Sequence, residues 1–286
     1  ENTDDTEIAR GLLKKAIELD DTLIAAKVLL GTTYRETGDY DKAMEIFTSA
    51  LKQAEELGDK LRMSSCLTGI GHIYSNKFEY VNALKYYKKS LKLCEELEDK
   101  SKEAGSLQNI AHIHKHQKRF DESLKYYNQS FKLLEEIDDG WRNMIFMGIG
   151  SLYCEKGDYD RALYNYQLSQ NWAEEFCNKL DKSHYYHNCG LIYVEIGDYD
   201  KALDYTTRTL NVVQEIGDKW RISISSFCVA KIYYLKNNYT KALEYLEEHL
   251  ALATKIQIEE CNHVWKYLCF KNLNQNYNKK EALNYI

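Results

Sequence analysis

Histidines are the residues whose type and spacing could most readily do chemistry in this sequence of 286 residues. His112 and His116 lie four residues apart, so on a helix both imidazoles share one face and could hold one metal ion. His72 lies forty residues before His112, and His184 lies three before His187. Helical units repeated at that distance would hold equivalent side chains roughly 10 Å apart, which strains shared ligation. We therefore expect these histidines to contact a peptide, or to form an ordinary polar surface, rather than to bind a metal.

The other residues that could form a chemical site have simpler explanations. No HExxH motif, glycine-rich phosphate loop or GxSxG motif occurs. Cys261, His263 and Cys269 have a weaker claim to a metal than the histidines above. Adjacent glutamates point about 100° apart on a helix, so repeated pairs fit solvated helix ends better than catalytic carboxylates. The pairs are Glu55-Glu56, Glu95-Glu96, Glu135-Glu136 and Glu174-Glu175. We predict neither catalytic residues nor a cofactor.

The composition narrows the class of partner. The net charge is −6 with both signs interspersed, and the absence of a basic block argues against nucleic acid. No apolar run approaches 18 residues, which argues against membrane insertion. The eight cysteines form no CxxC pair and fit buried reduced thiols, so we expect a cytoplasmic protein. The polar start without Met, and the helical pattern at residues 281–286, lead us to expect a piece of a longer chain.

A small residue, an aromatic residue three positions later and a second small residue twelve positions later recur along the chain. The first small position holds Gly31, Gly71, Ala111, Gly150, Gly190, Ala230 and Phe270. The aromatic position holds Tyr34, Tyr74, His114, Tyr153, Tyr193 and Tyr233. The second small position holds Ala43, Ala83, Ser123, Ala162, Ala202, Ala242 and Ala282. The spacing is forty residues, shortened once to thirty-nine before Gly150, and it indicates an internal repeat.

Each repeat predicts two helices joined by a tight turn. Apolar residues recur at helical spacing on both sides of Gly197-Asp198. Gly suits the left-handed residue that ends a helix, and Asp can cap the next helix. A similar stop signal at Leu57–Lys60 predicts a joint between units. The predicted units are 21–60, 61–100, 101–139, 140–179, 180–219 and 220–259, with partial units at 1–20 and 260–286.

These positions resemble the tetratricopeptide repeat, whose pattern has Leu-Gly-x-x-Tyr in its first helix and Ala, an aromatic residue and Ala in its second. The second full unit supplies Ile70-Gly71, Tyr74, Ala83 and Tyr87. The resemblance covers nearly the whole chain, although each unit is about six residues longer than the 34-residue form and the chain has no Pro. The period resembles a subclass found in Pins-type scaffolds, kinesin light chains and bacterial signalling proteins. It implies an all-α, right-handed superhelical solenoid of antiparallel helix pairs, with about six full repeats in one domain.

The resemblance also implies where a partner would bind. In the family, the first helices of successive units line the concave face, and partners lie along it as extended or helical peptides. Positions three and two before the first small residue, and one, four and five after it, therefore give a candidate groove. These positions hold Thr68, His72, Gln108, Asn109, His112, His116, Met147, Ser151, Glu155, His187, Asn188, Leu191 and Lys231.

We therefore expect a non-catalytic scaffold that binds a protein or peptide segment in this groove. A sensory or regulatory domain of a larger cyclase, kinase or transcription regulator is one alternative. Catalysis like that of bacterial repeat-containing phosphatases is another, for which the sequence offers no nucleophile and base. Co-chaperone repeats that hold a C-terminal carboxylate need Lys and Asn where this chain has Val28 and Thr32, so we expect no such clamp. A homodimer through the terminal helices stays open.

Overall fold

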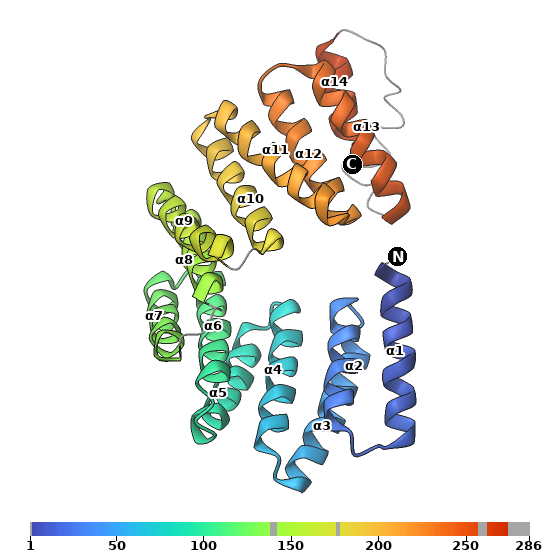
Figure 1. Cartoon of the computed structure of the whole chain (residues 1–286), viewed down its shortest axis with the longest axis vertical. Helices are drawn as coiled ribbons and strands as arrows, with labels where there is room; N and C mark the ends of the chain where they lie inside the picture. The colour runs from blue at the N-terminus through green and yellow to red at the C-terminus, as the bar shows by residue number, and fades with distance from the viewer. Residues whose placement is uncertain (1, 138–141, 176–177, 257–261, 274–286) are drawn as a thin grey trace. The chain divides into compact units, whose positions relative to one another are not determined.

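The described part of the chain consists of α-helices. The computed structural model describes residues 2–137, 142–175, 178–256 and 262–273, and within these ranges it has fourteen helices and no strand (Figure 1). The helices are α1 (Asn2–Leu19), α2 (Ile24–Glu36), α3 (Tyr40–Leu57), α4 (Lys60–Asn76), α5 (Tyr80–Glu96), α6 (Lys100–His116), α7 (Phe120–Glu136), α8 (Arg142–Lys156), α9 (Tyr159–Glu175), α10 (Lys179–Ile196), α11 (Tyr199–Ile216), α12 (Lys219–Leu235), α13 (Tyr239–Ile256) and α14 (Asn262–Asn272). The predicted all-α fold of consecutive helix pairs is confirmed.

The helices group into two compact units. Unit 1 is Glu1–Gly148 and unit 2 is Ile149–Ile286, so the division falls within α8. In unit 1, α4 packs most closely on α5 and α6 on α7; in unit 2, α10 packs on α11 and α12 on α13. Cys261, Ala282 and the helical pattern predicted at residues 281–286 lie outside the described residues.

The helix ends follow the local sequence. Gly58 ends α3 with φ +66°, and Asp59 then caps α4 by accepting a hydrogen bond of 3.0 Å from the N–H of Arg62. Gly197 ends α10 with φ +85° in the same way. Among the residues that the structure describes, four other than glycine take this left-handed conformation too, and they are Phe78, Glu98, Lys118 and Asn237. Glycine therefore makes the turn easier to form, and the repeat geometry imposes it where glycine is missing.

Close approach between the two helices of a pair explains the first small position. A Cβ added to Gly71 would lie 2.6 Å from the ring of Tyr87, and one added to Gly150 would lie 2.5 Å from the ring of Tyr166. Both rings are buried. A larger residue at this position would therefore push the paired helices apart.

Phe47 of α3 is a buried ring that contacts both its own pair of helices and the next pair. Phe47 is fully buried in the core of unit 1, and a Cβ added to Gly31 of its own pair would meet its ring at 3.0 Å. A Cβ added to Gly69, two positions before Gly71 in the next pair, would meet the same ring at 2.5 Å. One aromatic side chain thus packs against the first helices of two successive pairs, which stacks the pairs in a fixed register.

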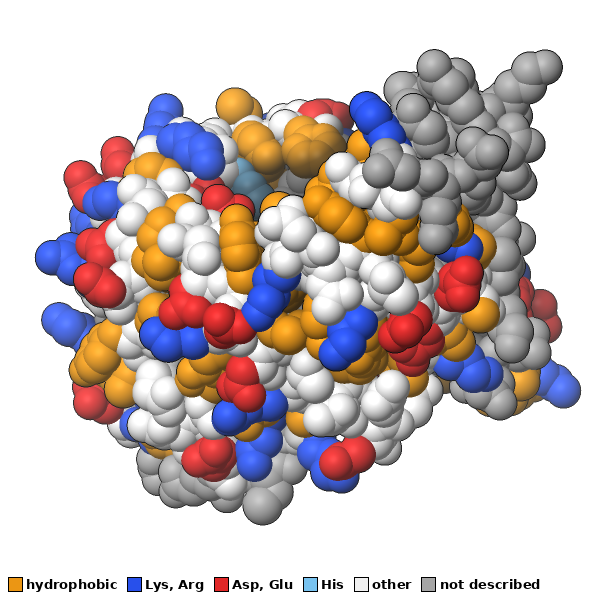
Figure 2. Space-filling model, turned by 90° about the horizontal axis from the view of Figure 1, so that it is seen from above, with side chains coloured by type: hydrophobic (Ala, Val, Ile, Leu, Met, Phe, Trp, Pro, Cys, Tyr) orange, Lys and Arg blue, Asp and Glu red, His pale blue; other side chains and the backbone are white. Residues whose placement is uncertain are grey.

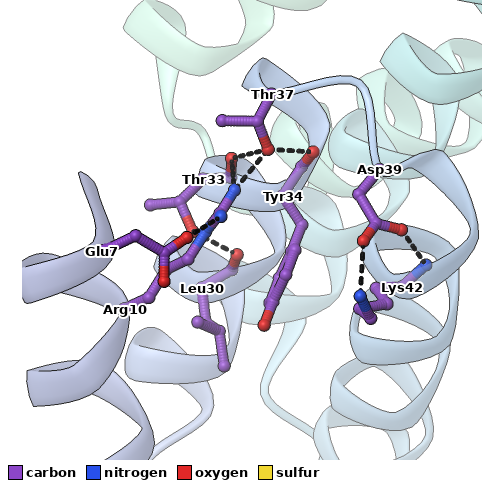
Figure 3. Close-up of polar contacts among 8 residues, drawn as sticks. All are labelled: Glu7, Arg10, Leu30, Thr33, Tyr34, Thr37, Asp39 and Lys42. Carbon is purple, nitrogen blue, oxygen red and sulfur yellow. Dashed lines mark hydrogen bonds and ion pairs between the residues drawn. The ribbon is translucent and has the colours of Figure 1, made fainter. Parts of the chain in front are cut away.

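Arg10 attaches α1 to the rest of unit 1 (Figure 3). Its side chain is buried, donates a hydrogen bond of 2.8 Å to the carbonyl of Thr33 and another to the hydroxyl of Thr37, and pairs with Glu7 at 2.7 Å. The guanidinium also lies 4.3 Å from the ring centroid of Tyr34. It therefore satisfies carbonyl and hydroxyl oxygens at the C-terminal end of α2, where positive charge is favoured.

Charged residues of both signs are interspersed on the face drawn in Figure 2. Ion pairs recur at a separation of thirty-six residues, among them Lys60–Glu96 at 2.8 Å, Lys100–Glu136 at 2.9 Å and Lys179–Glu215 at 2.9 Å. These three pairs are exposed, so each contributes at most about 1 kcal/mol to stability. None of the described helices is both long and apolar enough to cross a bilayer.

Candidate functional site

A groove of about 460 Å³ runs across the first helices of unit 1. Its sides come from α2, α4 and α6, and its floor includes Phe47 of α3 with Ser90 and Cys94 of α5. The rest of the lining is Val28, Thr32, Arg35, Ser64, Ser65, Thr68, Gly69, His72, Ser101, Lys102, Gly105, Ser106 and Asn109. Most of the lining residues thus carry a hydroxyl, amide or cationic group, while Val28, Phe47 and Cys94 are apolar.

Two glycines leave this space open, for different reasons. Gly69 has no room for a side chain, because a Cβ there would lie 2.5 Å from the ring of Phe47. Gly105 of α6 has space, because a Cβ there would meet nothing within 4 Å. A side chain introduced at Gly105 would therefore enter the groove without displacing the core.

Hydroxyl groups in the groove form a chain of hydrogen bonds. Ser90 donates to the carbonyl of Ser64 at 3.0 Å, so its single proton is used. The hydroxyl of Thr68, 2.8 Å away, must then donate to the Ser90 oxygen. The next pair repeats this arrangement, since Gln108 donates to Ser130 at 3.2 Å and Ser130 donates to the carbonyl of Ala104 at 2.9 Å. Thr68 and Gln108 therefore contribute to packing between helices.

His72 is a neutral histidine in the groove wall. Burial, with a smaller effect from the charge of Arg35, lowers its pKa from 6.5 to about 4. Its Nδ1 lies 2.8 Å from the hydroxyl of Tyr87, whose pKa is raised by burial. At neutral pH the tyrosine hydroxyl therefore donates to Nδ1, and the ring proton is on Nε2.

Arg35 and Lys102 are the charged side chains of the groove. Arg35 lies at the end of α2, and its Nη2 is 3.3 Å from a carboxylate oxygen of Glu36. Lys102 lies in the first turn of α6, and its Nζ is 2.6 Å from a carboxylate oxygen of Asp99. Neither Glu36 nor Asp99 lines the groove.

Unit 2 has its own, more apolar pocket of about 370 Å³ between α10, α11 and α12. Val213, Trp220 and Ile224 supply its apolar lining, and Trp220 is 48% exposed. The polar lining is Ser183, His184, His187, Thr209, Arg221 and Ser225. Burial lowers the pKa of both histidines, with the charge of Arg221 adding to the effect on His184. Arg221 is itself paired with Asp218.

The residues predicted for a groove are divided between these features. Thr68, His72 and Asn109 line the groove of unit 1, and His187 lines the pocket of unit 2. Gln108 lies beside the groove, with its amide donating to Ser130. The remaining predicted residues line neither space, and they are His112, His116, Met147, Ser151, Glu155, Asn188, Leu191 and Lys231.

His112 and His116 are exposed on α6, with ring centroids 4.4 Å apart. The ring of His116 also stacks on Tyr80 at 5.9 Å. Within the part of the chain that the structure describes, no group of three or more His, Cys, Asp or Glu side chains is arranged to hold a metal ion. The rings of His112, His116 and Tyr80 therefore form a line of aromatic contacts at the surface.

Sequence reasoning missed several groove residues. Arg35 and Thr32 occupy the positions four and one after Gly31, so the same counting rule finds them once it is extended to the first full unit. Ser65 and Gly105 both lie six residues before the small position of their units. Ser101 and Lys102 lie still earlier, in the first turn of α6, and only the packed structure brings them to the groove.

Models of known protein families match most of the sequence. A family model described as tetratricopeptide repeat matches residues 21–96, 65–136 and 141–215, and a second model with the same description matches residues 229–259. The sequence has no match among curated proteins.

Several solved structures share the fold. A signal-transduction ATPase with a tetratricopeptide repeat sensor, from Pyrococcus horikoshii, matches with a TM-score of 0.73 at 16% identity, over 97% of this chain and 43% of that one. Aspartyl phosphate phosphatase F from Bacillus subtilis matches at 0.71 and 17%, over 98% and 77%. The apo quorum sensor NprR from B. thuringiensis matches at 0.64 and 16%, over 99% and 85%. The chain thus spans under half of the sensor ATPase, and at these identities the likeness concerns the fold.

Proposed function

The chain belongs to the tetratricopeptide repeat family, and from this premise we propose that it is a non-catalytic scaffold that binds a peptide or protein segment in the groove of unit 1. The observation that carries the proposal is the groove itself, an open space between successive first helices with hydrogen-bonding groups along its sides. The Asn109 amide can donate to and accept from the backbone of an extended peptide, and the hydroxyl oxygens can accept from it. The apolar pocket of unit 2 offers a separate place for an apolar side chain.

The test is selection from a displayed library of random peptides of about twelve residues. Gly105→Phe should abolish binding of the selected peptides, because the ring enters the groove where a Cβ meets no other atom within 4 Å. Gly11→Phe is the matched control, since Gly11 is also a helical glycine with nothing within 4 Å and lies on α1 away from the groove lining.

Both substitutions replace a glycine inside a helix, so neither should lower the melting temperature. Peptides that bind wild type and Gly11→Phe but not Gly105→Phe support the groove as the binding site. Peptides that bind all three proteins equally would show that the groove is not the site.

The alternative is a sensory or regulatory domain within a larger signalling protein. The similar structure from Pyrococcus horikoshii carries a repeat sensor, and this chain spans 43% of it. On this alternative the 286 residues act as one repeat domain whose groove receives a peptide signal or a neighbouring domain. The sequence that flanks this segment in its gene distinguishes the two, because a cyclase, kinase or transcription-regulator domain there would favour the sensor.

Further expectations accompany the scaffold proposal. The buried free thiols of Cys66, Cys94, Cys189 and Cys269 suit a reducing compartment, so we propose a cytoplasmic location. α1 exposes Ile8, Leu12 and Leu19, and light scattering on the purified chain tests whether terminal helices pair in a homodimer.

A further inference from the structure

The groove of unit 1 differs in charge from the chain that forms it. The sequence has 44 acidic residues against 38 basic ones. Among the described residues that line the groove, Arg35 and Lys102 are cationic and none is acidic. On the face drawn in Figure 2, by contrast, Asp and Glu stand among Lys and Arg. The groove lining therefore carries two cationic side chains and no acidic one in a chain of net negative charge, and the carboxylates that pair with the two cations, Glu36 and Asp99, lie outside the lining.

Arg35 is suited to receive a carboxylate. Its side chain is 21% exposed, and its contact with Glu36 is long, at 3.3 Å, and comes from a neighbouring residue whose side chain is 61% exposed. A guanidinium has five N–H donors in a planar fork, so this contact leaves capacity for a second acceptor. The charge of Arg35 also lowers the pKa of His72 on α4, which means that its field extends into the groove wall.

Lys102 supplies a second positive charge on the other side helix. Its ammonium group pairs with Asp99, the residue that caps α6. The Lys102 side chain is 45% exposed, and an exposed pair of this kind contributes at most about 1 kcal/mol. A ligand carboxylate can therefore share the ammonium group at little cost.

We propose that the groove of unit 1 binds an acidic peptide segment, with Asp or Glu side chains paired to Arg35 and Lys102. The surrounding groups fit this ligand, because Asn109 and the hydroxyl groups can bond its backbone. A basic peptide would meet two like charges, and an apolar helix would lie against two charged side chains and several hydroxyl groups. The inference rests on the scaffold function proposed above, which it deepens by naming the chemistry of the partner.

The test uses the peptides selected from the random library against wild type. Those that Gly105→Phe blocks should be enriched in Asp and Glu. The double variant Arg35→Gln/Lys102→Gln should weaken their binding about tenfold or more in fluorescence anisotropy, because charge-assisted hydrogen bonds are lost. Raising NaCl from about 50 to about 500 mM should also weaken the binding of these peptides to wild type, because salt screens the attraction between opposite charges.

The matched control is Lys60→Gln/Arg208→Gln, which removes the same two charges at exposed side chains that do not line the groove. It should leave the affinity within about twofold of wild type. Groove-dependent peptides that are neutral or basic, or that bind both double variants equally, would overturn this inference and leave the scaffold function standing. A selection that yields no groove-dependent peptide would overturn both.

Discussion

Gly69 and Gly105 line the same groove, but substitution by alanine should destabilise the chain at Gly69 and stabilise it at Gly105. Gly69→Ala places a methyl group 2.5 Å from the buried ring of Phe47, which packs in the core and cannot move aside. We expect a loss of about 1 to 3 kcal/mol in the free energy of unfolding. Urea unfolding followed by circular dichroism measures it.

Gly105→Ala is the control on the neighbouring first helix. Its methyl group meets nothing within 4 Å, and alanine favours a helix more than glycine does, so stability should rise by about 0.5 to 1 kcal/mol. Equal effects of the two substitutions would contradict the account of Phe47 as a ring packed between two helix pairs.

Two residues that the sequence predicts to contact a partner, Thr68 and Gln108, form hydrogen bonds between helices. Thr68 donates to Ser90 and Gln108 donates to Ser130, in matching positions of successive pairs. Each acceptor then donates to a carbonyl of the first helix of its own pair. Substituting Thr68 or Gln108 would therefore affect stability as well as any binding, which makes Gly105 the better position for testing the groove.

At the scale of elements, α1 is attached to α2 by the hydrogen bonds of Arg10 and by Leu13 and Ile17, which pack on the core cluster of unit 1. Arg10→Leu removes the hydrogen bonds to Thr33 and Thr37 (Figure 3). Bonds from a charged donor are worth about 1.5 to 3 kcal/mol, and the oxygens at the end of α2 would lose their charged donor. We expect amide hydrogen exchange within α1 to accelerate about tenfold or more.

Lys15→Leu is the control for this prediction, since Lys15 is an exposed cation of the same helix. It should leave exchange in α1 unchanged, and exchange in α4 and α5 should be unchanged in both variants. If α1 exchanges equally slowly in Arg10→Leu and wild type, apolar contacts rather than Arg10 hold the helix.

At the scale of the whole molecule, buried histidines make stability depend on pH. The pKa of His72 is about 4 in the folded chain against 6.5 unfolded, and burial also lowers the pKa of His114 and His249. The folded chain binds fewer protons than the unfolded chain between these values. The stabilisation is therefore complete above about pH 6.5 and is lost as the pH falls toward 4.

For His72 alone, the linkage amounts to about 2 kcal/mol between about pH 7.5 and about pH 5. Urea unfolding at the two pH values measures it, and His72→Gln, which keeps a polar side chain without a titrating ring, should reduce the difference. Carboxyl groups such as Asp39, whose pKa is lowered by its bond to Lys42, titrate below this window. A pH dependence unchanged in His72→Gln would remove His72 as its source.

The two units have separate cores, and each has its own recess. Leu30, Phe47 and Ile70 belong to a core cluster of unit 1, whereas Leu210, Val213 and Val229 belong to one of unit 2. The groove of unit 1 is polar and cationic, and the pocket of unit 2 is mostly apolar. Repetition thus fixes how each pair folds, while differences between pairs give each unit its own chemistry.

The sequence by itself determined the fold, because its signals are local and recur. Gly71, Tyr74 and Ala83 mark one helix pair, and similar residue types recur about forty residues later. Each repeat therefore predicts the same helical hairpin. Helix periodicity and caps such as Asp59 need only a few neighbouring residues to be recognised. The family and the helix pairs followed from them.

Only the tertiary structure decided which variable residues line the groove of unit 1. Counting positions from Gly71 and Ala111 found His72 and Asn109, but it also included His112 and His116, which lie outside the groove. A groove is the space left after side chains from several helices have packed. Whether Gly105 opens that space, and whether Lys102 reaches it, depends on contacts between residues far apart in sequence, and no local pattern specifies them.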